Sequence, residues 1–192
     1  MILLNEFIDY AIQFWTVTAI VVVILLEIIV VVLDNKQTDK VKFTYEAMPC
    51  MQPIIIPTKG QGIWTAFFVW VMKTRTWKLS EDFFYTIDGE EYKISKGFVF
   101  DGASVPKFLR SILSPVGILL LGGLIHDYGY KHSRLCYRSG VSTELMSKKE
   151  LDHLFKSINI NVNGFKTLNY LTWYALRIGG FLAWRSHRKN DK

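Results

Sequence analysis

The chain has 192 residues, which suggests one domain with room for a short appendage. Half of the residues are hydrophobic and 15% are aromatic, so the chain can bury a sizeable core. The net charge of +6 favours an anionic partner, and no helix-turn-helix, zinc-finger or RNA-binding signature is visible. We therefore expect phospholipid headgroups and no specific nucleic acid, and the two cysteines exclude a disulfide framework.

The first predicted element is a membrane-spanning helix over residues 14–33. At ~1.5 Å per residue this nearly continuous apolar run would span roughly 30 Å, the thickness of the hydrocarbon core. Acids precede the run and lysines follow it, which predicts a permanent single-pass anchor with the C-terminal domain on the cytoplasmic side. The membrane would be a virion membrane or a host inner membrane. The anchor domain is residues 1–34, with the membrane residues Phe14, Trp15, Glu27 and Leu33.

Glu27 interrupts the apolar run and has two interpretations. Its side chain could snorkel to the interface or pair within an assembly, or it could be a functional carboxylate inside the membrane. No other residue of the run is polar enough to form a relay, which favours the first interpretation.

After a polar linker at residues 35–42, one α+β domain is expected over residues 43–192. Its β section covers about residues 43–100 and is rich in β-branched and aromatic residues. The clearest element is an antiparallel hairpin, in which an Asp88-Gly89 turn joins F-F-Y-T-I to E-E-Y-K-I. A further strand is expected from Gly97 to Phe100. The apolar run from Gly62 to Met72 is too short to cross a membrane and predicts a core strand.

The helical section covers about residues 104–186. Helices are expected from Pro106 to about Leu113 and from Pro115 to about His132. Ser147 and Glu150 form a capping box that starts a helix ending near Asn159. A last helix should run from about Gly164 to Trp184. Strands followed by helices are typical of an α+β fold with segregated elements.

The most informative segment is L-I-H-D-Y-G-Y-K, which begins at Leu124. On a helix, His126 and Tyr130 share one face while Asp127 points about 100° away. Two glycines just before His126 would let a second helix or a substrate approach the imidazole closely. On the later helix, Asp152 flanks the apolar stripe, where its carboxylate could reach the same place. We therefore expect D-G-A-S, the H-D-Y-G-Y segment and Asp152 to converge.

The segment H-D-Y-G-Y-K resembles the H-D-x-x-Y segment of the phospholipase A₂ superfamily, particularly its short prokaryotic members. The order D-G-A-S, H-D-Y-G-Y, L-D-H-L-F is the same as in that superfamily. The resemblance implies a phospholipase A₂-like helical core. It gives His126 the role of general base on a water molecule, Asp152 the role of orienting the imidazole, and Tyr130 a hydrogen bond to Asp152. It also implies a Ca²⁺ site made by Asp127 with backbone carbonyls of the loop that contains Asp101 and Gly102.

A second resemblance covers more of the chain, from about Trp77 to Gly180. The motifs W-K-L-S-E-D-F-F-Y, G-F-V-F-D-G-A-S-V-P-K-F-L, L-I-H-D-Y-G-Y and Y-A-L-R-I-G-G occur in that order. They resemble a largely phage-borne family catalogued as domain of unknown function number 1353. This resemblance implies a phage or prophage setting.

Two functions remain open from the sequence. One is a membrane-anchored, phage-type hydrolase that acts on phospholipid esters with His126 and Asp152 as its catalytic pair. The other is a non-catalytic structural or scaffolding protein of a phage particle, whose partners are lipid and other virion proteins. In that case the His-Asp pair is a satisfied polar cluster that ties helices together. A transition-metal site made of His126, Asp127 and Asp152 is a further alternative for the same residues.

Overall fold

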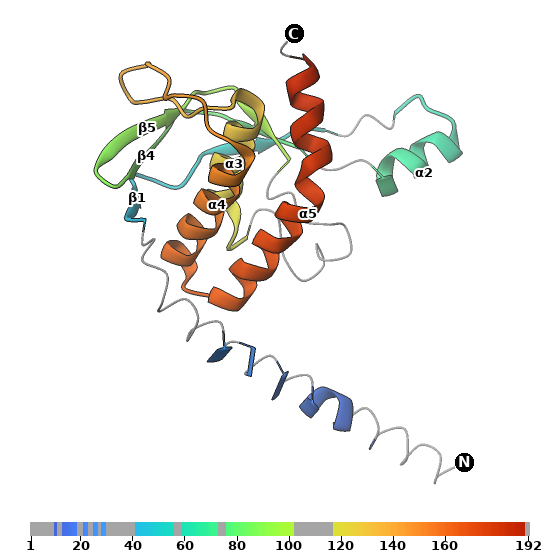
Figure 1. Cartoon of the computed structure of the whole chain (residues 1–192). Helices are drawn as coiled ribbons and strands as arrows, with labels where there is room; N and C mark the ends of the chain where they lie inside the picture. Colours follow the sequence, from blue (N-terminus) through green and yellow to red (C-terminus); the bar gives the residue numbers. More distant parts are fainter. Residues whose placement is uncertain are drawn as a thin grey trace.

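The computed structural model describes residues 10, 13–18, 21–22, 25–26, 28–29, 41–55, 59–72, 76–101 and 117–190. Small antiparallel sheets come first in the chain, and three helices that pack together follow them (Figure 1). The α+β class is therefore confirmed, but the expected order of all strands before all helices is not, because α2 (Ile63–Met72) lies between β2 (Met51–Pro53) and β3 (Trp77–Leu79) in the chain.

The first sheet has the strand order β1 (Phe43–Tyr45), β4 (Phe83–Ile87), β5 (Glu90–Ile94), with both pairings antiparallel. The predicted hairpin is β4–β5. Its turn residues Asp88 and Gly89 both have positive φ values, 51° and 94°, as a tight two-residue turn requires. Along β4 the side chains alternate between buried and half-buried, so one face of this sheet is directed toward the core.

The second sheet has the order β2 (Met51–Pro53), β3 (Trp77–Leu79), β6 (Val99–Phe100), again antiparallel. The strand expected from Gly97 to Phe100 corresponds to β6, and it pairs with β3. This pairing positions Asp101, the first residue of the D-G-A-S motif, directly after a strand. Residues 102–116, which include Gly102 and the helix expected from Pro106, lie outside the described residues.

Three helices follow the sheets: α3 (Leu120–His132), α4 (Lys148–Asn163) and α5 (Lys166–Asn190). The capping box that starts α4 is confirmed, because the Ser147 side chain accepts from Glu150 N and the Glu150 side chain accepts from Ser147 N. Gly164 ends α4 with φ of 69°. Both α4 and α5 extend beyond the ends expected from the sequence. In Figure 1, α3, α4 and α5 lie side by side.

The main hydrophobic core lies between the two sheets and the helices α3 and α4. Tyr85 and Ile94 from the first sheet, Leu124 and Ile125 from α3, and Ile158 from α4 are all fully buried in it. At roughly 1.5–3 kcal/mol for each large apolar side chain, this core fixes α3 against the first sheet. The middle of α3 is therefore a rigid position for a functional side chain.

The structure contradicts the prediction of a membrane-spanning helix at residues 14–33. Over the part of the chain that is described, no helix is long and apolar enough to cross a membrane. A span needs about 20 consecutive apolar residues in one helix. The prediction rested on hydropathy, which measures the composition of a run and does not by itself establish a spanning helix. The predicted single-pass membrane localisation rested on this anchor and is therefore not supported either. Phe14 and Trp15 are exposed, and Glu27 and Leu33 lie outside the described residues.

The core strand expected from Gly62 to Met72 is also wrong. These residues form α2 (Ile63–Met72), and Ile63 and Trp64 are 82% and 76% exposed. A strand needs a neighbouring strand to pair its backbone, whereas a helix pairs its own. In the first turn of α2, Ala66 N donates a hydrogen bond to the Gly62 carbonyl oxygen at 2.9 Å.

Candidate functional site

Two glycines on α3 let α4 approach closely around His126. A Cβ atom added to Gly122 would lie 2.3 Å from Asn159 Nδ2, and one added to Gly129 would lie 2.3 Å from Leu151 Cδ2. The space that the glycines leave is therefore filled by α4, and His126 is only 2% exposed. The expected close approach of a second helix is thus confirmed at Gly122, whereas the approach at Gly129 was not predicted.

The structure brings together three residues that the sequence analysis placed in one site. His126 Nε2 lies 3.0 Å from Asp152 Oδ1, and the Tyr130 hydroxyl donates to the same oxygen at 2.5 Å. Asp152 itself is 0% exposed. On α5, Gly180 leaves room for Tyr130, because a Cβ atom there would lie 2.8 Å from the Tyr130 hydroxyl oxygen. The Asp152 carboxylate is thus enclosed by α3, α4 and α5.

The second oxygen of Asp152 contacts two cations whose role the sequence analysis missed. Lys148 Nζ donates to Asp152 Oδ2 at 2.7 Å, and Arg177 Nη1 donates to it at 3.1 Å. Lys148 Nζ also donates to the Leu176 carbonyl on α5 at 2.9 Å. The i, i+4 spacing of Lys148 and Asp152 on one helix is a signal that could have revealed the first contact. Arg177 comes from another helix and leaves no such signal.

These contacts determine the charge states of the pair. Burial acts to raise the pKa of Asp152, but hydrogen bonds from His126, Lys148 and Tyr130 outweigh it and hold that pKa well below its usual range. Burial acts to lower the pKa of His126, but the carboxylates of Asp127 and Asp152 outweigh it and raise that pKa. Asp152 is therefore ionised at neutral pH, with its carboxylate facing the imidazole.

The tautomer of His126 follows from this charge state. An ionised carboxylate only accepts hydrogen bonds, so His126 Nε2 must carry the proton that Asp152 accepts. In the neutral imidazole the lone pair is then on Nδ1. The dyad therefore directs the basic nitrogen of His126 away from Asp152 and toward Asp127.

Asp127 lies on the opposite side of the imidazole from Asp152. Its Oδ1 is 4.0 Å from His126 Nδ1, and its buried Oδ2 accepts no hydrogen bond within the described part of the chain. Burial raises the pKa of Asp127 to about 7; His126 opposes this shift, and the neighbouring carboxyl of Asp101 adds to it. The carboxyl groups of Asp127 and Asp101 therefore interact, and Asp127 Oδ2 has no hydrogen-bond donor among the described residues.

The donors around Asp127 fit a hard cation in part. Carboxylate oxygens are the ligands that Ca²⁺ prefers, and the unpartnered Asp127 oxygen beside Asp101 is such a donor. Across the described ranges, however, no three His, Cys, Asp or Glu residues are grouped as metal ligands. In addition, Asp127 and Asp152 face opposite nitrogens of the His126 ring. The alternative of a transition-metal site made of these three residues is therefore wrong.

Comparisons with known proteins place the chain in a family. No curated protein and no solved structure matches it. A family model matches residues 77–176, just over half of the chain, and this range includes His126, Asp127, Tyr130 and Asp152. The chain therefore belongs to the family described as "Protein of unknown function (DUF1353)".

Proposed function

We propose that this protein is a phage-type hydrolase with a phospholipase A₂-like site that cleaves phospholipid esters. The observation that supports the proposal most is the buried pair in which His126 Nε2 lies 3.0 Å from Asp152 Oδ1. This pair leaves Nδ1 as a proton acceptor, which is what a general base needs. The phage setting and the phospholipase likeness rest on the motif resemblances.

In the proposed reaction, His126 Nδ1 takes a proton from a water molecule as its oxygen attacks the ester carbonyl. The imidazolium that forms is stabilised by the Asp152 carboxylate. The bond between the carbonyl carbon and the alkoxy oxygen then breaks, and His126 returns the proton to the leaving alcohol. Tyr130, Lys148 and Arg177 act as positioning residues, because they hold the Asp152 carboxylate in place.

Asp127 and Asp101 are the residues that would hold Ca²⁺ in this proposal. When bound, the cation would supply a positive charge that polarises the ester carbonyl. Because the pKa of Asp127 is raised to about 7, a proton competes with the cation below neutral pH. Cation binding should therefore strengthen as the pH rises through 7.

The test is the release of fatty acid from liposomes of defined phospholipid composition, with and without calcium. We expect His126→Gln and Asp152→Asn to lower the rate by about 10²- to 10⁴-fold, the usual contribution of a general base. His153→Gln is the matched control, because His153 follows Asp152 in the chain but its ring packs at a tilt against Trp173, with the ring centres 5.0 Å apart. If wild type and His126→Gln release fatty acid at the same background rate, the proposal fails.

A second candidate function is a non-catalytic structural or scaffolding role in a phage particle. It is favoured by one observation: His126 is 2% exposed and its cluster joins α3, α4 and α5. In this case a folded His126→Gln protein would still support particle assembly and infectivity. Phage that carry this variant should be compared with phage that carry His153→Gln. A loss of infectivity confined to His126→Gln, with normal protein folding, would reject the structural role.

A further inference from the structure

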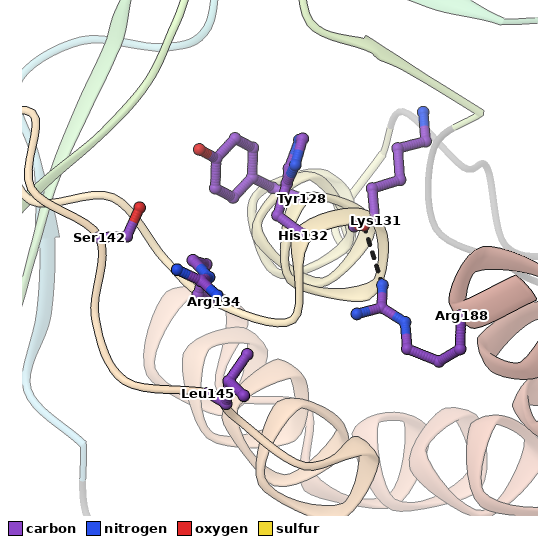
Figure 2. A pocket seen from close by; sticks show the side chains of 7 residues that line it. All are labelled: Tyr128, Lys131, His132, Arg134, Ser142, Leu145 and Arg188. Carbon is purple, nitrogen blue, oxygen red and sulfur yellow. Dashed lines mark hydrogen bonds between the residues drawn. The ribbon is translucent and has the colours of Figure 1, made fainter. Parts of the chain in front are cut away.

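A cavity of about 450 Å³ lies at the C-terminal end of α3 (Figure 2), and neither His126 nor Asp152 is among its described lining residues. This volume is in the range of small-molecule sites. Among the described residues that line it, none is an acid and several are bases. The lining residues are Tyr128, Lys131, His132, Arg134, Ser142, Leu145 and Arg188.

Two arginines lie on either side of the α3 end in Figure 2, Arg134 on the connection after α3 and Arg188 on α5. Arg134 is exposed, and within the described part of the chain it has no hydrogen bond or ion pair. Its charge is therefore available to a ligand.

Arg188 is held in place by the end of α3. Its Nη2 donates to the carbonyl oxygens of Tyr130 at 2.6 Å and Lys131 at 2.9 Å, and its guanidinium carbon lies 4.8 Å from the centre of the Trp184 ring. These contacts offset the partial negative charge of the helix C-terminus. They also orient the guanidinium before any ligand arrives.

The remaining polar groups strengthen the positive field. Lys131 donates through Nζ to the Val99 carbonyl and lies 4.8 Å from the Phe98 ring centre, so it contributes its charge from the edge of the cavity. Ser142 adds a neutral hydroxyl donor on the same side as Arg134 (Figure 2). The described residues that line the cavity thus include three cations, Lys131, Arg134 and Arg188, and no carboxylate.

We propose that this cavity binds a phosphate group, carried either by a small soluble ligand or by a lipid headgroup. Guanidinium groups present planar pairs of N–H donors that match phosphate oxygens. The cavity is larger than phosphate alone, so the ligand has space for the group attached to it. The proposal does not depend on hydrolysis at His126.

The test is a titration of the full chain with inorganic phosphate, followed by calorimetry and by the fluorescence of Trp184, which stacks on Arg188. We expect Arg134→Gln to weaken binding by about tenfold, as loss of one charged hydrogen bond should. Arg134→Lys keeps the positive charge but loses the paired N–H donors of the guanidinium, so it should weaken binding less than Arg134→Gln does. Arg185→Gln is the control, because Arg185 is on the same helix as Arg188 but contacts Phe181.

A second arm measures co-sedimentation with phosphatidylcholine vesicles, with and without added phosphatidic acid. Arg134-dependent binding of free phosphate assigns the site to soluble phosphate ligands. Arg134-dependent binding that occurs only on phosphatidic acid vesicles assigns it to a lipid headgroup. Three results overturn the proposal: no binding of either probe, binding that Arg134→Gln leaves unchanged, or an equal loss with Arg185→Gln. Unfolding curves of each variant establish that the fold is intact.

Discussion

Asp152 accepts hydrogen bonds from four side chains, one on its own helix and three on the two neighbouring helices. A buried charge is costly unless it is paired, and removing one partner leaves the charge uncompensated. The sequence predicted the contacts with His126 and Tyr130, because a known spacing pattern includes them. The Arg177 contact depends on how α5 packs, which no local pattern specifies.

Lys148→Met should lower the free energy of unfolding by about 1–3 kcal/mol. The substitution removes the donor 2.7 Å from Asp152 Oδ2 and the additional bond to the Leu176 carbonyl, while Arg177 still compensates part of the charge. Denaturant unfolding at neutral pH measures the change. Lys149→Met is the matched control, because its exposed neighbour Lys149 should change stability by less than about 0.5 kcal/mol. Equal effects of the two substitutions would show that the Asp152 contact contributes nothing.

Among the secondary-structure elements, the sequence correctly predicted the turn and the helix start that a few neighbouring residues specify. The Asp88-Gly89 turn and the Ser147–Glu150 capping box are both present, because each is specified by a few neighbouring residues. The strand expected from Gly62 to Met72 failed, since its apolar residues fit a strand or a helix equally well and only a pairing partner decides. The expected anchor failed for a related reason: hydropathy alone does not establish a spanning helix, and no helix among the described residues is long and apolar enough to cross a membrane.

The close packing of α3 on α4 gives a prediction at this scale. Gly122→Ala should lower the free energy of unfolding by about 1–3 kcal/mol, because the new Cβ atom would overlap the buried Asn159 side chain. Overpacking outweighs the gain of up to ~1 kcal/mol that alanine brings to a helix. Gly179→Ala on α5 is the control with the opposite sign, since a Cβ atom there meets nothing within 4 Å. Stabilisation by both substitutions would contradict the observed α3–α4 contact.

In the whole molecule, α3 positions both proposed sites. Its middle carries His126 against α4 and α5, and its C-terminal end carries the cavity with Arg134 and Arg188 nearby. The fold determines this arrangement, because α3 is fixed on one side by the first sheet and on the other by α4. The first site is recognisable in the sequence by its motif, whereas the second is not, because its cations come from separate segments of the chain.

The buried titratable groups give the whole molecule a characteristic pH dependence. Asp152 has a folded-state pKa below its unfolded value, so its stabilising contribution is present above about pH 4 and is lost as the pH falls further. The pKa of Asp127 is raised in the folded protein, so its effect on stability has the opposite sign. Between about pH 4 and pH 7 the folded protein keeps a proton that the unfolded chain releases, and stability falls as the pH rises. The raised pKa of His126 acts in the same direction, and its contribution is lost as the pH rises above about 6.5.

Without added divalent cations, stability should therefore be greatest in mildly acidic solution and should fall toward neutral pH. The slope for one proton is at most about 1.4 kcal/mol per pH unit. Urea unfolding over a pH series measures this profile, and Asp127→Asn should flatten the fall between about pH 4 and pH 7. Asp82→Asn, at an exposed residue on the strand side of the fold, should leave that fall unchanged. A wild-type stability that rises steadily from pH 4 to pH 7 would show that Asp127 is ionised in the folded protein.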